Sequence, residues 1–332
     1  MIEDQYVLFS VFRLPVTAYA LCLSLSLAAT LAVFFRRCVR EGVDGNAAWR
    51  TALLALPLGL IGARVFYCAA RYKLYNEIGF GSALALWNGG YALWGAVGGA
   101  ALAAVIAARR SRVRPARVLD AMAPAGALAI GLMRFAEYFS GEGRGRLVEN
   151  EAFQRFPFAV YSEAYEEWYL AVFILEGLAA LAIFAALLRA RRAPGDKARM
   201  LLILYSACQM LLESLREDSC LKWLFVRVSQ LTAALVLAGL MIAAAVKWAR
   251  KGHNGGISKG RMAAYGGLFL LGVCVIIAME FAVDGKILAG LPEWADYLII
   301  ALSCAVMGRA AWRTVLRSTA ETIDKNGAEL LK

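Results

Sequence analysis

The segment PVTAYALCLSLSLAATLAVFF, residues 15–35, contains no charged residue and is followed at once by Arg36 and Arg37. A helix rises about 1.5 Å per residue, so a run of this length is long enough to cross the roughly 30 Å hydrocarbon core of a bilayer. Similar apolar runs, separated by short charged stretches, recur along the 332-residue chain. The pattern predicts an all-α protein, a polytopic bundle of transmembrane helices.

Nine runs have the length of a membrane span. The chain is 61% hydrophobic and has a mean hydropathy of +0.60, whereas a soluble globular domain is about half apolar. This composition argues against a soluble domain. The predicted spans are residues 15–35, 50–70, 84–108, 118–139, 168–189, 199–216, 228–247, 262–283 and 295–312.

The net charge of the chain is +11, and the basic residues are distributed according to the predicted spans. Lys and Arg gather in alternate loops, namely 36–50, 109–117, 189–199 and 247–261. Positive loops face the cytoplasm, so we expect the N-terminus outside and the C-terminus in the cytoplasm. This alternation explains the charge by membrane topology rather than by nucleic-acid binding.

The longest external connection is predicted at residues 140–167. It contains several Gly and Glu residues and the aromatic stretch 156–158, and it is long enough to form a small extracytoplasmic cap. The single histidine, His253, falls in a polar loop. We therefore expect no histidine-based metal site or catalytic dyad.

The predicted spans contain several charged residues, among them Arg64, Arg134, Glu137, Glu176 and Glu213. A charge within a span is energetically costly and normally faces the bundle interior or a wet cavity. Arg134 and Glu137 are three residues apart, so they share one face of a helix. Any one of these residues has an alternative interpretation as an interhelical tie, but the set as a whole favours a functional site.

A second polar pattern lies on the sixth predicted span. Tyr205, Gln209, Glu213 and Arg216 step at i, i+4, i+8 and i+11, which makes one polar stripe on an otherwise apolar helix. The residues that fall toward the outer ends of their spans are Arg134, Glu137, Glu142, Glu213 and Arg216. A site built from them is expected to open at the outer leaflet. Arginine suits an anionic headgroup there, because guanidinium binds phosphate in a bidentate manner.

Residues 134–146, RFAEYFSGEGRGR, resemble the signature of the prolipoprotein diacylglyceryl transferase family. Tyr19 falls where that family has a tyrosine in its first span. The resemblance covers roughly residues 13–248. Other segments resemble further family motifs in the same order: GARVFY at 62–67, WNGGYALWG at 87–95, LD and AP at 119–124, the stripe at 205–216, and SQ at 229–230.

This resemblance implies a reaction. Members move the diacylglyceryl group of phosphatidylglycerol onto the cysteine thiol of a preprolipoprotein signal peptide, in the bacterial cytoplasmic membrane and without a metal or cofactor. The reaction forms a thioether and releases glycerol phosphate. The resemblance implies catalytic roles for Arg134, Glu137 and Tyr19. It implies lipid-binding roles for Arg64, Trp94, Glu142, Gly145, Arg146, Tyr205, Gln209, Glu213 and Arg216.

The chain departs from the family pattern at three positions. Trp94 replaces a histidine, and an indole cannot take a proton from a thiol. Glu137 replaces an asparagine and Gln209 replaces an arginine, so the site becomes more negative by two charges. Glu137 then has two interpretations, as a general base or as an ion-pair partner that neutralises Arg134.

These departures leave alternatives open. The second hypothesis is a catalytically inactive lipid-binding or partner-binding membrane protein on the same scaffold. A small-molecule transporter is a third, which the absence of an internal repeat disfavours. For the domains, the resemblance implies a seven-span transferase-like core at residues 1–250, with the external cap at 140–167. Two additional spans and a cytoplasmic tail are expected at 251–332.

Overall fold

The structure is a computed structural model of the whole chain. It describes residues 7–11, 14–163, 165–190, 193–217, 221–223, 226–250, 257–283 and 292–316. The predicted loop residue His253 and the tail residues 317–332 lie outside the described residues.

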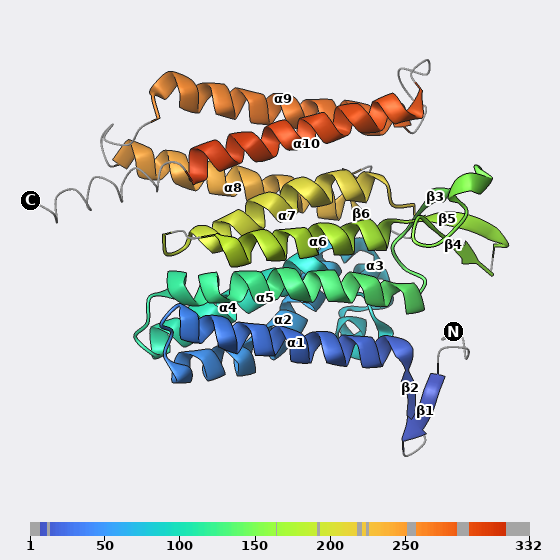
Figure 1. Cartoon of the computed structure of the whole chain (residues 1–332), viewed down its shortest axis with the longest axis horizontal. Coiled ribbons are helices and arrows are strands. Elements are labelled where there is room, and N and C mark those ends of the chain that lie inside the picture. The colour runs from blue at the N-terminus through green and yellow to red at the C-terminus, as the bar shows by residue number, and fades with distance from the viewer. Residues whose placement is uncertain are drawn as a thin grey trace, which may run out of the picture.

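Long helices dominate the described part of the chain, and they run side by side in a bundle (Figure 1). Nine of them have at least 18 residues. They are α1 (Ala18–Arg40), α2 (Gly45–Ala70), α4 (Leu93–Arg110), α5 (Pro115–Ala136), α6 (Val172–Arg189), α7 (Asp196–Ser214), α8 (Val228–Arg250), α9 (Lys259–Val283) and α10 (Glu293–Val315). The predicted fold class, a polytopic helical membrane bundle, is confirmed.

The prediction of nine spans needs one correction. Eight of the nine helices are long and apolar enough to cross a membrane, and α7 is not among them. The helix carries Asp196, Lys197, Arg199 and Glu213, which lower its hydropathy. It packs against α5, α6, α8 and α10, so its polar residues lie inside the bundle rather than against lipid.

Two predicted boundaries were also wrong. The third span was predicted to begin at residue 84, but α4 begins at Leu93. The preceding residues form the short helix α3 (Tyr72–Ile78) and the 3₁₀ turns η2 (Phe80–Leu84) and η3 (Leu86–Asn88). The fifth span was predicted from residue 168, which instead lies in a strand. Apolar composition alone does not distinguish a membrane-depth loop or a strand from the helix it precedes.

Small β-structures gather at one end of the bundle (Figure 1). We call this the cap end. A three-stranded antiparallel sheet has the order β3-β5-β4, and β1 and β2 form a separate hairpin. The strands are β1 (Val7–Val11), β2 (Leu14–Thr17), β3 (Arg144–Leu147), β4 (Ala159–Ser162), β5 (Glu167–Ala171), β6 (Lys222–Trp223) and β7 (Val226–Arg227), with η5 (Glu151–Phe153) between β3 and β4.

Polar side chains define where several helices begin. Thr17 accepts a hydrogen bond from the Ala20 amide at the start of α1, which satisfies one of the unpaired amides of a first turn. At α7 the cap comes from another helix. Asp120 of α5 accepts from the backbone amides of Gly195 and Ala198 at 2.6 and 3.0 Å. This buried carboxylate therefore joins α5 to the beginning of α7.

Glycines allow α2 and α4 to pack with their backbones close together. A Cβ atom added to Gly99 would lie 2.6 Å from the carbonyl carbon of Leu58, and one added to Gly62 would lie 3.3 Å from the Cα of Gly99. Neither position has room for a side chain. Such small-residue contacts replace the hydrophobic driving force that membrane helices lack between one another.

The last two helices lie on the outer side of α7 and α8 (Figure 1). They share a hydrophobic core with the rest of the bundle, in which Ile203 of α7, Leu237 of α8 and Ile300 and Met307 of α10 are almost completely buried. The hairpin α9–α10 is therefore packed onto the bundle rather than extending away from it.

Candidate functional site

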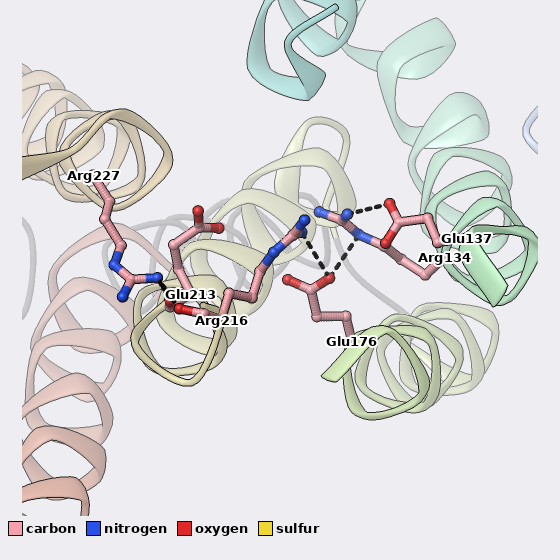
Figure 2. Close-up of polar contacts among 6 residues, drawn as sticks. All are labelled: Arg134, Glu137, Glu176, Glu213, Arg216 and Arg227. Atoms are coloured by element: carbon pink, nitrogen blue, oxygen red, sulfur yellow. Dashed lines mark hydrogen bonds and ion pairs between the residues drawn. The ribbon is translucent and has the colours of Figure 1, made fainter. Parts of the chain in front are cut away.

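Arg134 lies in a buried cluster at the cap end of the bundle (Figure 2). It projects from the last turn of α5. Its Nη1 donates to Glu137 Oε1 at 2.5 Å, on the 3₁₀ turn η4 (Glu137–Phe139), and its Nε lies 3.0 Å from Glu176 Oε2 on α6. Two carboxylates therefore hold one guanidinium group, and the residues three positions apart do meet.

Glu176 also connects Arg134 to Arg216. The same Oε2 atom lies 3.4 Å from Arg216 Nη1, so one carboxylate oxygen sits between two guanidinium groups (Figure 2). Its other oxygen, Oε1, is buried and has no hydrogen-bond partner among the described residues. The bridging carboxylate offsets the repulsion between the two arginines, which lets them stay close together.

Arg227, at the end of β7, holds the C-terminal end of α7. Its Nη1 donates to the backbone carbonyls of Glu213 and Arg216, at 2.6 and 2.5 Å (Figure 2). Carbonyls at a helix end lack partners within the helix, and a cation is favourable there. Arg227 thereby fixes the backbone from which the side chains of Glu213 and Arg216 extend.

Trp94 and Tyr205 pack together next to this cluster. Their ring centroids are 5.8 Å apart, and both side chains are buried. Tyr205 also lies within electrostatic range of Arg134 and Glu176. The Nε1 of Trp94 has no hydrogen-bond partner among the residues that the structure describes. Trp94 thus contributes an apolar ring and one hydrogen-bond donor, the indole N–H, but no group that can accept a proton.

Tyr19 reaches the same region from the first turn of α1. It lies within electrostatic range of Arg134, Glu137 and Glu142, and α1 packs against η4. The structure therefore brings the predicted first-span tyrosine to the charged cluster, although more than a hundred residues separate it from the others in sequence.

The stripe on α7 faces the bundle interior as its spacing indicates. Tyr205, Gln209 and Glu213 are all buried, and Arg216 follows just beyond the end of the helix. The Oε1 atom of Gln209 is buried with no hydrogen-bond partner in the described part of the chain. Gln209 therefore brings an unsatisfied amide, and no charge, to a position on the cluster side of α7.

A cavity of about 290 Å³ opens between the cap and the end of α5. Glu137 and Glu142 both line it, together with Arg144, whose Nη1 donates to Ser162 Oγ at 2.7 Å. The remaining lining is largely aromatic: Tyr138, Phe156, Tyr161, Trp168 and Phe173. The Oε2 atom of Glu137 has no hydrogen-bond partner among the described residues, so an acceptor stands unused at a residue that borders this cavity.

Gly143 lets the cap pass close to Glu137. Its φ angle is +73°, and an added Cβ would lie 2.5 Å from Glu137 Oε2 and 2.7 Å from the Cβ of Phe173. A side chain would be strained by the backbone conformation and would also collide with both neighbours. Glycine at this position therefore leaves room for the carboxylate of Glu137.

Gly145 and Arg146 connect the cap to the helix ends below it. Gly145 of β3 forms an antiparallel bridge with Arg216. The guanidinium of Arg146 lies 5.6 Å from the ring centre of Tyr297 on α10, and its Nε is 3.8 Å from Glu217 Oε1. These two residues position the cap relative to α7 and α10.

Arg64 occupies a different setting. Its guanidinium donates five hydrogen bonds to the carbonyls of Ser82, Ala83, Ala85, Gly89 and Gly90. These carbonyls belong to the irregular segment between α3 and α4, where they lack the backbone amide partners that a regular helix would supply. The donors of Arg64 are thus committed to holding that segment, which leaves its predicted role in lipid binding without support from the geometry.

Sequence reasoning named Glu176 among the charged residues of the functional site, but no pattern linked it to Arg134 and Arg216. It missed Arg227 altogether. Arg227 lies outside every motif and acts through backbone carbonyls, which carry no sequence signal. Its position just before an apolar run was the one available indication.

The site combines features suited to a phosphate-bearing substrate. Two guanidinium groups share a carboxylate that an anion would compete with, and an unpartnered carboxylate oxygen stands nearby. In the described part of the chain, no three His, Cys, Asp or Glu side chains group closely enough to hold a metal ion. The described residues thus provide charge and hydrogen bonding rather than metal ligands.

Comparisons with known proteins point the same way. Residues 6–248 match the model of the prolipoprotein diacylglyceryl transferase family. A protein of Frankia alni named phosphatidylglycerol--prolipoprotein diacylglyceryl transferase is 32% identical over 235 residues, which cover 69% of this chain and 62% of that relative. The relative of the same name in Mycobacterium leprae is 37% identical over 136 residues, 40% of this chain and 41% of its own length.

The chain therefore spans less than two thirds of the length of these curated relatives. The family match nevertheless covers most of the chain and includes α1 to α7 and nearly all of α8, whereas α9 and α10 lie beyond it. The residues of the charged cluster, Arg134, Glu137, Glu176, Glu213, Arg216 and Arg227, all fall within the matched region. The chain belongs to the prolipoprotein diacylglyceryl transferase family.

Proposed function

We propose that this protein transfers the diacylglyceryl group of phosphatidylglycerol to the cysteine thiol of a preprolipoprotein signal peptide. It acts in the bacterial cytoplasmic membrane, with the N-terminus and the cap end outside and the C-terminus in the cytoplasm. Residues 1–250 form the transferase core. The observation that carries the proposal is the pair of arginines, Arg134 and Arg216, bridged by Glu176 beside the outer cavity.

The two arginines bind the phosphate of the donor. Glu176 Oε2 lies between the two guanidinium groups. A phosphate there is a charge-assisted acceptor for both, and the bidentate geometry of guanidinium favours it. During the reaction the bond between the glycerol carbon and the phosphate oxygen breaks, and glycerol phosphate leaves with the electron pair. The positive charge of the two guanidinium groups stabilises the negative charge that develops on the leaving oxygen.

Glu137 takes the proton of the attacking thiol. Trp94 has no acceptor, so the general base must come from another group. Glu137 Oε2 is unpartnered among the described residues, and Glu137 borders the cavity, while its Oε1 stays fixed by Arg134. The thiolate then attacks the glycerol carbon and forms the thioether. Glu137 thus acts both as the ion-pair partner of Arg134 and as the proton acceptor.

Complementation tests this function. The chain is expressed in cells depleted of their own transferase, and a lipoprotein is examined by mass spectrometry for thioether-linked diacylglycerol. We expect the modification with the natural chain and none with Arg134→Ala, at equal amounts of membrane-inserted protein. No modification by the natural chain would refute the assignment of this activity.

A second function is favoured by one specific contact. The 2.5 Å pair between Arg134 and Glu137 partly neutralises the cation that would bind phosphate. An inactive lipid-binding or partner-binding protein on the same scaffold would retain such a pair. Native mass spectrometry of the detergent-extracted protein distinguishes the two functions. Bound phospholipid without any transfer to a synthetic lipobox peptide would favour the lipid-binding protein.

A further inference from the structure

The hairpin α9–α10 lies outside the family match, yet it contacts the part of the core that carries the site. We propose that Glu280 of α9 is a positioning residue for the reaction, because it fixes the amide of Gln230 and thereby the C-terminal turn of α7. This inference rests on the proposed function for its role in catalysis. The contact itself is independent of that function.

The contact is a small polar network inside an apolar core. The Nε2 atom of Gln230 lies 2.8 Å from Glu280 Oε1, 2.8 Å from Ser214 Oγ and 3.1 Å from the carbonyl of Met210. Ser214 Oγ is also 3.1 Å from that carbonyl. Gln230, Ser214 and Met210 are buried, so every donor here requires a partner.

Donor counting determines the direction of these bonds. An amide nitrogen has two hydrogens, and a carboxylate oxygen accepts. One hydrogen of Gln230 therefore goes to Glu280 Oε1, and the other is shared between Ser214 Oγ and the Met210 carbonyl. The hydroxyl of Ser214 then donates to the Met210 carbonyl. The carboxylate of Glu280 thus excludes the flipped orientation of the Gln230 amide, in which its oxygen would face α9.

The C-terminal turn of α7, which this network fixes, carries or adjoins two residues of the site. Ser214 directly follows Glu213, and Arg216 is two residues further on. Arg227 holds the carbonyls of Glu213 and Arg216 from one side, and the Gln230 network holds the same turn from within the bundle. Loss of the network would leave Arg216 attached to a looser helix end.

A second contact ties the hairpin to the cap. Tyr297 of α10 lies under the guanidinium of Arg146, 5.6 Å from ring centre to guanidinium carbon. The hairpin therefore reaches the site region at two points, through α9 at Gln230 and through α10 at Arg146. A carboxylate within a membrane helix is costly to retain without a use, and the network gives Glu280 that use.

The test compares Glu280→Ala, Glu280→Asp and the matched control Ser303→Ala in the full-length protein. Ser303 lies on α10, and its hydroxyl donates to the carbonyl of Ile299 in its own helix at 2.8 Å. We expect Glu280→Ala to lower kcat for transfer to a lipobox peptide about tenfold, with KM for phosphatidylglycerol changed less than twofold. Glu280→Asp should recover part of kcat, and Ser303→Ala should retain all of it.

Hydrogen–deuterium exchange gives a readout that does not depend on activity. Glu280→Ala should speed exchange of the amides of residues 212–216 by about tenfold, while exchange in the middle of α7 stays unchanged. The same acceleration is expected from Gln230→Ala, and the double variant should add nothing further. Unchanged exchange at 212–216, or a fully active Glu280→Ala protein, would overturn the inference. If the natural chain shows no transfer at all, the proposed function fails while the exchange result still decides this contact.

Discussion

Buried charges gather at both ends of the bundle, but the two groups differ in what they leave unpaired. At the end opposite the cap, Glu41 accepts from Arg37 at 2.6 Å and also from Lys197, while Asp120 accepts from two backbone amides. The atom without a partner there, among the described residues, is a donor, Arg37 Nε. That group joins α1, α5 and α7.

At the cap end, the atoms without a partner among the described residues include two carboxylate oxygens, Glu137 Oε2 and Glu176 Oε1. A cavity lies next to the first of these residues. An unsatisfied buried acceptor lowers stability, so its presence needs an explanation. The contacts of the first group hold helices together, whereas the second group retains bonding capacity that the proposed function assigns to a substrate. The following substitutions test that distinction.

The largest effect is expected from Arg134. Arg134→Ala removes the cation shared by two carboxylates and should lower transfer at least about 1,000-fold, in line with the loss of a preorganised electrostatic group. Arg134→Lys keeps the charge without the fork of donors and should be intermediate. Both are measured as kcat/KM with a lipobox peptide, beside the melting temperature in detergent. Full activity of Arg134→Ala would remove Arg134 from the site.

Glu137→Gln separates the two roles of Glu137. The amide can still accept from Arg134, but it cannot take a proton from a thiol, so transfer should fall about 100-fold with little change in melting temperature. The matched change at the opposite end, Glu41→Gln, should leave kcat within twofold of the natural value. Equal activity of Glu137→Gln and the natural protein would show that Glu137 serves only as an ion-pair partner.

Two glycines with similar backbone angles allow a matched comparison of packing. Gly143→Ala should lower the free energy of unfolding by about 2–3 kcal/mol, because the new Cβ meets Glu137 and Phe173 at a φ of +73°. Gly42→Ala, at the opposite end and with φ of +64°, meets nothing within 4 Å and should lower it by only about 1 kcal/mol. Chemical denaturation in detergent measures both. Equal losses would mean that backbone strain alone accounts for Gly143.

The smallest effect concerns pH and Glu41. Burial raises the pKa of Glu41, but the hydrogen bond and charge of Lys197, followed by those of Arg37, outweigh it and leave the pKa below its ordinary value. Because the folded-state pKa is lowered, the stabilisation is fully present above about pH 4.3, the ordinary pKa of glutamate, and is lost as the pH falls through the lower folded value. Glu41 is partly exposed, so we expect no more than about 1 kcal/mol.

In Glu41→Gln, the free energy of unfolding should therefore fall less steeply at acidic pH than it does in the natural protein. Melting temperatures measured between pH 3 and pH 7 test this, with Asn46→Ala as a surface control at the same end. An unchanged acidic limb in Glu41→Gln would assign the pH dependence to another carboxylate.

Much of the fold could be predicted from the sequence, because a membrane span needs an apolar run of about twenty residues, and such a run is visible in the sequence. Arg134 and Glu137 could be paired from their spacing alone, and the α7 stripe from its period. The bridge by Glu176 could not be predicted, since it depends on how α6 rotates against α5. The charge of Arg64 within an apolar run, and the resemblance of its motif, predict a site residue, yet its partners are backbone carbonyls of a segment 18 to 26 residues later.

The polar character of α7 has a consequence for how the protein is made. A helix with four charged residues does not partition well into lipid on its own, and its first turn is capped by Asp120 of the earlier helix α5. During synthesis, α7 must therefore leave the insertion machinery directly against helices that are already in place. The order of the chain, with α5 and α6 completed before α7 begins, supplies that surface at the moment when it is needed.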